Sequence, residues 1–166
     1  LLYGTASEPY VYDKESDTNI ALKFTHRLSK VVLKFMDMEK NPLTVSDVKI
    51  LGMPVSAAFN VQTGTLTTDD NSVADITPYV NSANNYREAI ILPVALSDAY
   101  KVSFVLDGRT REWVFADLDI SLPKFNAGSQ YTFGIYIDPT EDIIIGRLED
   151  VDAGNSSAPW EDGSNE

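Results

Sequence analysis

The stretch from Ile20 to Phe35, IALKFTHRLSKVVLKF, constrains the fold of this chain more than any other. Apolar residues occupy every second position in each half, first at Ile20, Leu22 and Phe24 and then at Val31, Leu33 and Phe35. A period of two places alternate side chains on opposite faces of a strand, so each half predicts a strand with one face in a core. The polar joint between them, Thr25-His26-Arg27, holds the only histidine of the chain. Most hydrolytic and metal chemistry would need that imidazole, so a scaffold or binding surface is expected before an enzyme.

The rest of the chain continues in short segments of strand character separated by turn residues. Further strands are predicted at Val45–Ile50, Ala57–Val61, Thr65–Thr68, Glu88–Pro93, Tyr100–Leu106, Thr110–Phe115, Tyr131–Asp138 and Ile143–Ile145. Asp107-Gly108 is the strongest hairpin signal. Gly52, Met53 and Pro54 are expected to interrupt the third strand. Residues 69–87 are expected to form a loop, with a turn of helix near Ile76–Val80.

No window shows a sustained period of 3.6 residues, and turn signals recur every 8 to 12 residues, as is typical of an all-β chain. The predicted fold is a two-layer antiparallel β-sandwich. The 166 residues suffice for one such domain. Its expected organisation is a lead-in or interdomain segment at 1–19, the sandwich at 20–146, and an extended or partly ordered acidic tail at 147–166.

Charge and composition exclude several functional classes. The chain has 13 Lys and Arg against 25 Asp and Glu, a net charge of −12, so nucleic acid and anionic membrane surfaces are poor partners. The absence of cysteine excludes disulfides, zinc–thiolate sites and thiol nucleophiles. No apolar run approaches the roughly 20 residues needed to span a bilayer. No cofactor and no metal ion are expected, and the chain is predicted not to be an enzyme.

Several sequence motifs, taken in order, resemble one known family. The string FTHRLSKVVLKF looks like the central motif of the fimbrillin-like proteins of Bacteroidetes, which include the major fimbrillins and the Mfa-like anchor and tip proteins. The other matching pieces are Leu1-Leu2-Tyr3-Gly4, Glu88–Pro93, Val102–Gly108, Gly128–Asp138 and the tail segment Pro159–Gly163. The likeness therefore spans nearly the whole chain.

The resemblance implies a transthyretin-like β-sandwich that is exported by a lipoprotein route and displayed on the outer membrane as part of a type V pilus. Its partners would be other pilus subunits and a host or bacterial surface ligand. In this family, subunits polymerise by strand exchange after a protease removes an N-terminal strand. The chain contains no first domain, no lipidated cysteine and no processing site, so these are expected in a longer precursor. The subunit class (stalk, anchor or tip) stays open.

Strand exchange also has a physical basis, because an open sheet edge presents unpaired N–H and C=O groups to an extended segment of a neighbour. The candidate residues for donation or for filling a groove are Ile143, Ile144, Ile145 and Trp160. Two simpler interpretations remain open: the isoleucines form an internal last strand, and Trp160 covers the core of its own subunit.

Other polar residues are interpreted as structural. His26 is expected to end a strand, since the chain has no second histidine and no G-x-S-x-G nucleophile motif. Asp69-Asp70-Asn71 and Asp117-x-Asp119 could hold calcium, but neither completes a calcium-loop pattern, so solvated turns are favoured.

The alternative function is a surface-exposed glycan-binding module of an outer-membrane lipoprotein. Sugar binding often uses exposed rings, and several tyrosines lie in or beside predicted loops: Tyr3, Tyr10, Tyr12, Tyr79, Tyr86 and Tyr100. Most of these rings are more simply explained as core or sheet-surface residues.

Overall fold

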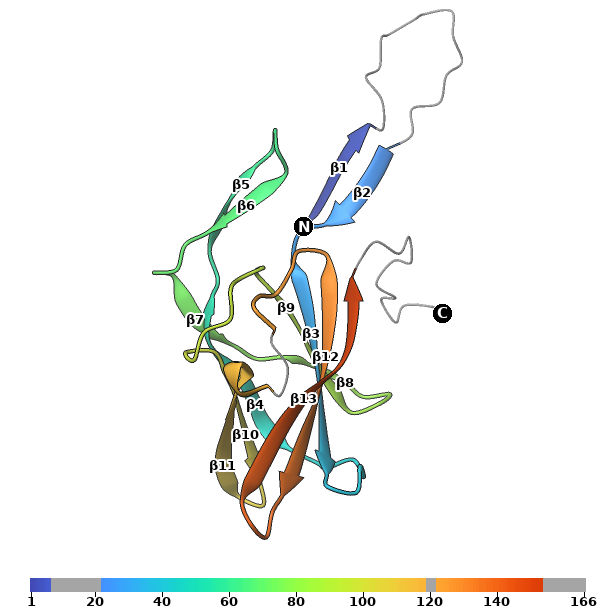
Figure 1. The fold of residues 1–166 in the computed structure, drawn as a ribbon, viewed down its shortest axis with the longest axis vertical. Helices are drawn as coiled ribbons and strands as arrows, with labels where there is room; N and C mark the ends of the chain where they lie inside the picture. Colours follow the sequence, from blue (N-terminus) through green and yellow to red (C-terminus); the bar gives the residue numbers. More distant parts are fainter. Residues whose placement is uncertain (7–21, 119–121, 154–166) are drawn as a thin grey trace, which may run out of the picture.

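The computed structural model describes residues 1–6, 22–118 and 122–153, and within these ranges the chain is almost entirely β-strand (Figure 1). The strands are β1 Leu2–Ala6, β2 Leu22–His26, β3 Ser29–Asp37, β4 Ser46–Pro54, β5 Ala57–Asn60, β6 Thr65–Thr68, β7 Val73–Ile76, β8 Tyr79–Asn81, β9 Tyr86–Ile91, β10 Lys101–Leu106, β11 Arg109–Val114, β12 Ser129–Asp138 and β13 Ile143–Ala153. A 3₁₀ turn spans Phe115–Asp117. The described residues form no helix long and apolar enough to cross a membrane.

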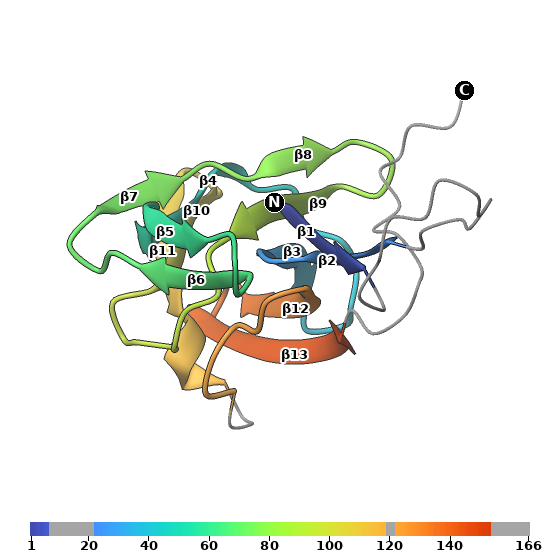
Figure 2. The same ribbon diagram turned by 90° about the horizontal axis from the view of Figure 1, so that it is seen from above.

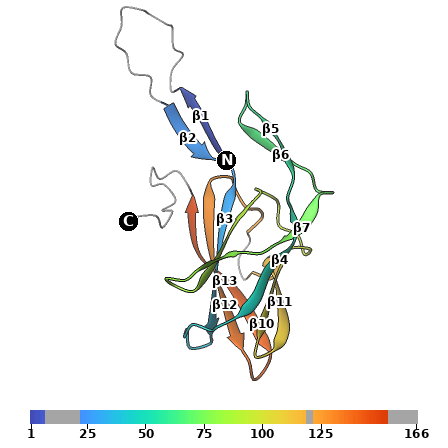
Figure 3. The same cartoon turned by 180° about the vertical axis from the view of Figure 1, so that it is seen from behind.

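Two sheets form the sandwich predicted from the sequence. One has the order β13-β12-β3-β9-β8 and the other β11-β10-β4-β7. The remaining strands form two separate ribbons, β1–β2 and β5–β6, which project from the same end of the sandwich (Figures 1 and 3). Neighbouring strands are antiparallel with one exception, since β12 runs parallel to β3 at the centre of the larger sheet.

The core lies between the two sheets and is rich in aromatic rings. In β3 the three residues expected in the core, Val31, Leu33 and Phe35, are buried, and Val32 on the opposite face is buried too, at 5% exposure. Phe35 meets Phe104 of β10 across the core, with ring centroids 4.9 Å apart. Phe133 of β12 similarly packs against Trp113 of β11 at 5.9 Å. Such tilted and edge-to-face pairs add to the energy of apolar burial.

One side of the sandwich is closed where β11 meets β13. Gly146 of β13 lies directly against the Trp113 indole, which would overlap a Cβ at this position. Nearby, the buried Arg111 side chain donates from Nε to Asp142 Oδ1 at 2.7 Å and from Nη1 to the Leu106 carbonyl at 3.0 Å. These contacts hold the β10–β11 hairpin against the β12–β13 hairpin.

Three expectations about strand extent were wrong. Strand β4 continues through Gly52, Met53 and Pro54 rather than being interrupted there. Gly52 takes φ +72° and the β4–β7 register shifts between Ile50 and Met53, so an irregularity absorbs the turn-forming residues within the strand.

Residues 69–87 are not one loop, since they contain β7, β8 and the start of β9. No helical turn forms near Ile76–Val80; these residues belong to the two short strands and the link between them. Strand β13 is also much longer than Ile143–Ile145, and it carries residues 147–153 of the expected tail into the sheet. Short or acidic strands at a sheet edge have little apolar alternation by which a sequence could reveal them.

We predict that Gly146→Ala destabilises the protein, because the added methyl group overlaps the buried Trp113 ring. Overpacking of this kind costs about 1–3 kcal/mol, which denaturant unfolding would measure. The double variant Gly146→Ala/Trp113→Phe should recover part of that cost relative to the sum of the two single variants. Strictly additive effects would show that the contact is not the cause.

Candidate functional site

The outer edge of β13 is the most extended unpaired backbone in the larger sheet. The strand has 11 residues and pairs with β12 from Ile143 to Ala153, apart from the extra residue Glu149. It stands last in the sheet order, so its other side has no strand partner among the residues that the structure describes. An edge of this length offers its free N–H and C=O groups to another extended chain.

The three predicted isoleucines lie at the start of this edge strand. Ile143 pairs with Asp138 and is 41% exposed. Ile144 is half-buried and packs against the core, and Ile145 pairs with Tyr136. The isoleucines therefore belong to the sheet of their own subunit and border its free edge. Trp160, the fourth candidate residue, lies outside the described residues.

The β1–β2 ribbon is a second surface of exposed backbone and apolar side chains. Its strands pair only with each other, from Leu2 opposite His26 to Ala6 opposite Leu22. The expectation that Phe24 faces a core was wrong, since its ring is 59% exposed. Among the described strands, none forms a second layer against β2, and alternation alone cannot distinguish a core strand from a ribbon strand. Leu1 and Leu2 are also more than half exposed.

Tyr3 connects the two projecting ribbons, which lie near each other in the view from above (Figure 2). Its ring meets Phe59 of β5 edge-on at 5.7 Å, and its hydroxyl donates to the Gln62 carbonyl at 3.2 Å. The guanidinium of Arg27 lies 4.9 Å from the ring centroid. Gly64, at φ +67°, leaves room for the ring, which would overlap a Cβ at that position. We call these contacts the Tyr3 latch.

His26 ends β2, as the sequence predicted. Burial lowers the pKa of its imidazole, which disfavours the charged form. This placement at the base of the ribbon is consistent with a structural residue.

Of the candidate calcium ligands, the structure describes Asp69, Asp70, Asn71 and Asp117. Asp69 uses Oδ1 to accept from the backbone N–H of Asn71 at 3.1 Å, which closes a turn. Asp119, of the second motif, lies outside the described residues. Across the part of the chain that the structure describes, no three His, Asp, Glu or Cys side chains gather as metal ligands would.

The tyrosines proposed for sugar stacking that the structure describes do not form one surface. Tyr10 and Tyr12 lie outside the described residues, and Tyr3 belongs to the latch. Tyr79, at the outer strand of the larger sheet, is 70% exposed, whereas Tyr86, which begins β9, and Tyr100, which precedes β10, are half-buried. Sequence reasoning missed the latch; its only sequence signal is Gly64 in the turn between β5 and β6.

Comparison with known proteins gives one family. A family model described as fimbrillin-like matches residues 1–149. No curated protein matches the chain.

Two solved structures share the fold. A candidate cell adhesion protein of Bacteroides uniformis has a TM-score of 0.64 at 21% identity, over 92% of this chain and 66% of its own. A second, from Bacteroides ovatus, has a TM-score of 0.58 at 14% identity, over 82% of this chain and 49% of its own. The chain thus spans between about half and two thirds of the length of these structures.

We predict that Gly64→Ala releases the β1–β2 ribbon. Contacts of the kind made by Tyr3 contribute roughly 0.5–1.5 kcal/mol each, so amide exchange in residues 2–6 and 22–26 should accelerate about tenfold. Hydrogen exchange read by mass spectrometry measures this locally.

Gly108→Ala is the matched control, because Gly108 has a similar φ of +72° but nothing within 4 Å of an added Cβ. Both variants carry the same backbone strain, and only the first disturbs Tyr3. Equal rates of amide exchange in the β1–β2 ribbon of the two variants would contradict the role of the Tyr3 latch in stabilising that ribbon.

Proposed function

The chain belongs to the fimbrillin-like family, and we propose that it forms part of a pilus subunit that acts in fimbrial assembly and adhesion by strand complementation. The observation that carries this proposal is the free outer edge of β13. An extended segment of a neighbouring subunit would add to this edge as a further strand. Main-chain hydrogen bonds would then supply affinity, and alternate side chains would supply specificity.

Within this proposal, Ile143, Ile144 and Ile145 line the start of the accepting edge, and Trp160 is the candidate side chain for filling a groove on a neighbour. The role is structural and non-enzymatic. The protein would act at the cell surface within a pilus, with a lipid anchor in the outer membrane on a part of the protein outside this chain. Its partners would be other pilus subunits and a surface ligand, consistent with the strongly acidic charge, which disfavours nucleic acid.

We predict that Ile143→Lys in the full-length protein weakens subunit assembly, because a lysine on an edge strand opposes pairing with another strand. The expected result is fewer oligomers and filaments, measured by sedimentation velocity and electron microscopy. Since Ile143 is already 41% exposed, the variant should unfold at nearly the same denaturant concentration as the parent protein.

Ile90→Lys is the matched control. Ile90 has a similar exposure of 45%, but it lies in β9, which β12 and β3 separate from β13 in the sheet. The control should assemble normally. Equal assembly of both variants would contradict the proposal that the β13 edge accepts a strand of a neighbouring subunit.

Trp160 is tested separately. Loss of assembly in Trp160→Ala but not in Trp160→Phe would identify Trp160 as the groove-filling residue.

A further inference from the structure

The outer face of the larger sheet carries a pocket of about 370 Å³. We call it the outer pocket. Lys34 of β3, Tyr136 of β12 and Glu149 of β13 line it from the sheet. The turn after β3 adds Lys40, and the loop before β9 adds Asn84 and Asn85, with Tyr86 beside them. Pockets that hold small molecules are typically 300–1,000 Å³, so this volume suits a group of about one sugar ring.

Two local features of the backbone, a bulge in β13 and a glycine in β12, place Glu149 in the pocket. The β12–β13 register shifts between Thr132 and Phe133, which leaves Glu149 as an extra residue in β13. Such a bulge redirects a side chain. Opposite it, Gly134 has no Cβ, and a Cβ there would collide with the Glu149 carboxylate and the Tyr136 ring. The carboxylate therefore lies flat on the sheet beside Tyr136.

The Glu149 carboxylate is held by two donors. Lys34 Nζ lies 2.9 Å from Oε2, and the Tyr136 hydroxyl donates to Oε1 at 2.8 Å. Burial alone would raise the pKa of Glu149, but the hydrogen bonds from Lys34 and Tyr136 outweigh it, and the pKa is lowered. A fixed, ionised carboxylate can still accept further hydrogen bonds, because each oxygen has two lone pairs.

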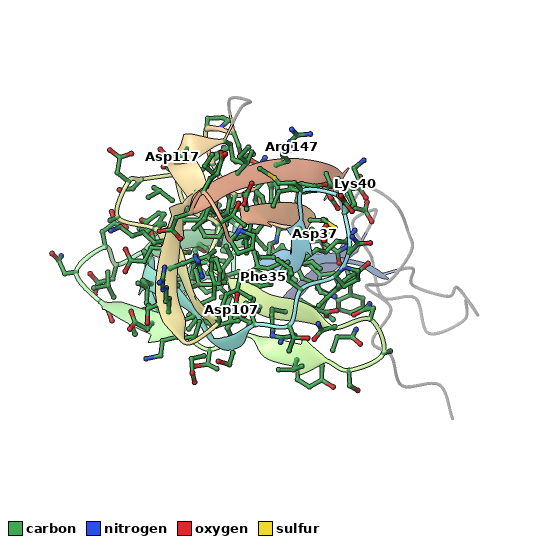
Figure 4. The ribbon with its side chains drawn as sticks, turned by 90° about the horizontal axis from the view of Figure 1, so that it is seen from below. Phe35, Asp37, Lys40, Asp107, Asp117 and Arg147 are labelled. Atoms are coloured by element: carbon green, nitrogen blue, oxygen red, sulfur yellow. The ribbon has the colours of Figure 1, made fainter. Side chains whose placement is uncertain are left out.

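The charges that act on this carboxylate are those of lysines, although the chain as a whole carries −12. The Lys34 ammonium lies 5.0 Å from the Tyr86 ring centroid, and the Arg147 guanidinium lies 5.3 Å from that of Tyr136. Lys40 is close enough to lower the pKa of Glu149 further by its charge. In Figure 4, Arg147 on β13 and Lys40 in the turn after β3 lie on the same side of the molecule. Two of these cations, Lys34 and Lys40, act on the Glu149 carboxylate, and the Asp37 carboxylate in the turn of Lys40 accepts from the backbone N–H groups of Glu39 and Asn41.

Several donors of the outer pocket remain available. Asn84 accepts from the Tyr86 N–H through Oδ1 at 3.0 Å, and Asn85 accepts from Arg87 through Oδ1 at 3.0 Å. Each amide thus uses its oxygen for the protein and keeps its NH₂ group for a ligand. Lys40 forms no ion pair within the described residues, so its three donors are also available.

From these groups we propose that the outer pocket binds a carboxylated monosaccharide, a uronic acid or a sialic acid. The ammonium of Lys40 and the asparagine amides would receive the carboxylate of the sugar, and Glu149 would accept its hydroxyl groups. A fixed carboxylate beside the cations disfavours sulfate, which has no hydroxyl group to donate, and the phosphate dianion, which carries more negative charge than a sugar carboxylate. A neutral sugar would gain no ion pair with Lys40.

The test is titration of the ¹⁵N-labelled protein, followed by NMR, with D-glucuronic acid and N-acetylneuraminic acid. D-glucose and inorganic phosphate serve as comparison ligands. We expect at least one of the two acids to shift the amide signals of Lys40, Asn84 and Asn85 at saturable concentrations, and to bind at least about tenfold more tightly than glucose or phosphate. Equal binding of glucose, tighter binding of phosphate, or no binding of either acid would overturn the proposal.

Lys40→Gly should weaken binding of the acid about tenfold or more. Lys40 takes φ +70°, a conformation that glycine adopts without strain, so the variant removes the ammonium without disturbing the turn. Lys40→Arg should retain most of the binding, and Lys49→Ala, which removes an exposed lysine of β4 on the other sheet, should bind like the parent protein. Unchanged affinity in Lys40→Gly, or an equal loss in Lys49→Ala, would contradict the assigned site.

Discussion

The parallel pairing of β3 with β12 is the contact on which the remaining structure depends. Both strands are buried over most of their length, and their inward-facing side chains make up one layer of the aromatic core. A strand has only two edges, and β3 fills one edge of β12, so β13 must take the other. Strand β11 packs against β13 through Trp113 and Gly146, but no second strand of the described chain forms a ladder with β13. The open edge is therefore a consequence of how the core is built.

The same central strand explains the projecting ribbon. Strand β3 follows β2 after only two residues, so the chain passes almost directly from the most buried strand of the sheet into a ribbon outside it. The ribbon has no core of its own, and an isolated two-stranded ribbon is marginally stable. The Tyr3 latch supplies the missing contacts by joining it to the β5–β6 ribbon.

The sequence predicted those parts of the fold in which a buried strand or a tight turn leaves a local pattern of residues. The alternation of Val31, Leu33 and Phe35 and the Asp107-Gly108 turn were sufficient to place β3 and the β10–β11 hairpin. Strands β7 and β8 left no such pattern because they are short, exposed edge strands that pairing holds in place. Phe24 shows the converse, since its strand has the right alternation but no sheet packs against it.

Candidate sites were predictable only in part for the same reason. Ile143 to Ile145 form an apolar run that is visible in the sequence. The outer pocket joins Lys34 and Glu149, which are 115 residues apart, through a bulge that only the pairing register reveals.

The β13 edge and the outer pocket use different directions of the same sheet. Main-chain hydrogen bonds of β13 lie in the plane of the sheet, whereas side chains such as Glu149 project roughly perpendicular to it. A strand added at the edge would extend the sheet without covering the pocket, so a subunit could be assembled in a filament and still present the pocket to a ligand.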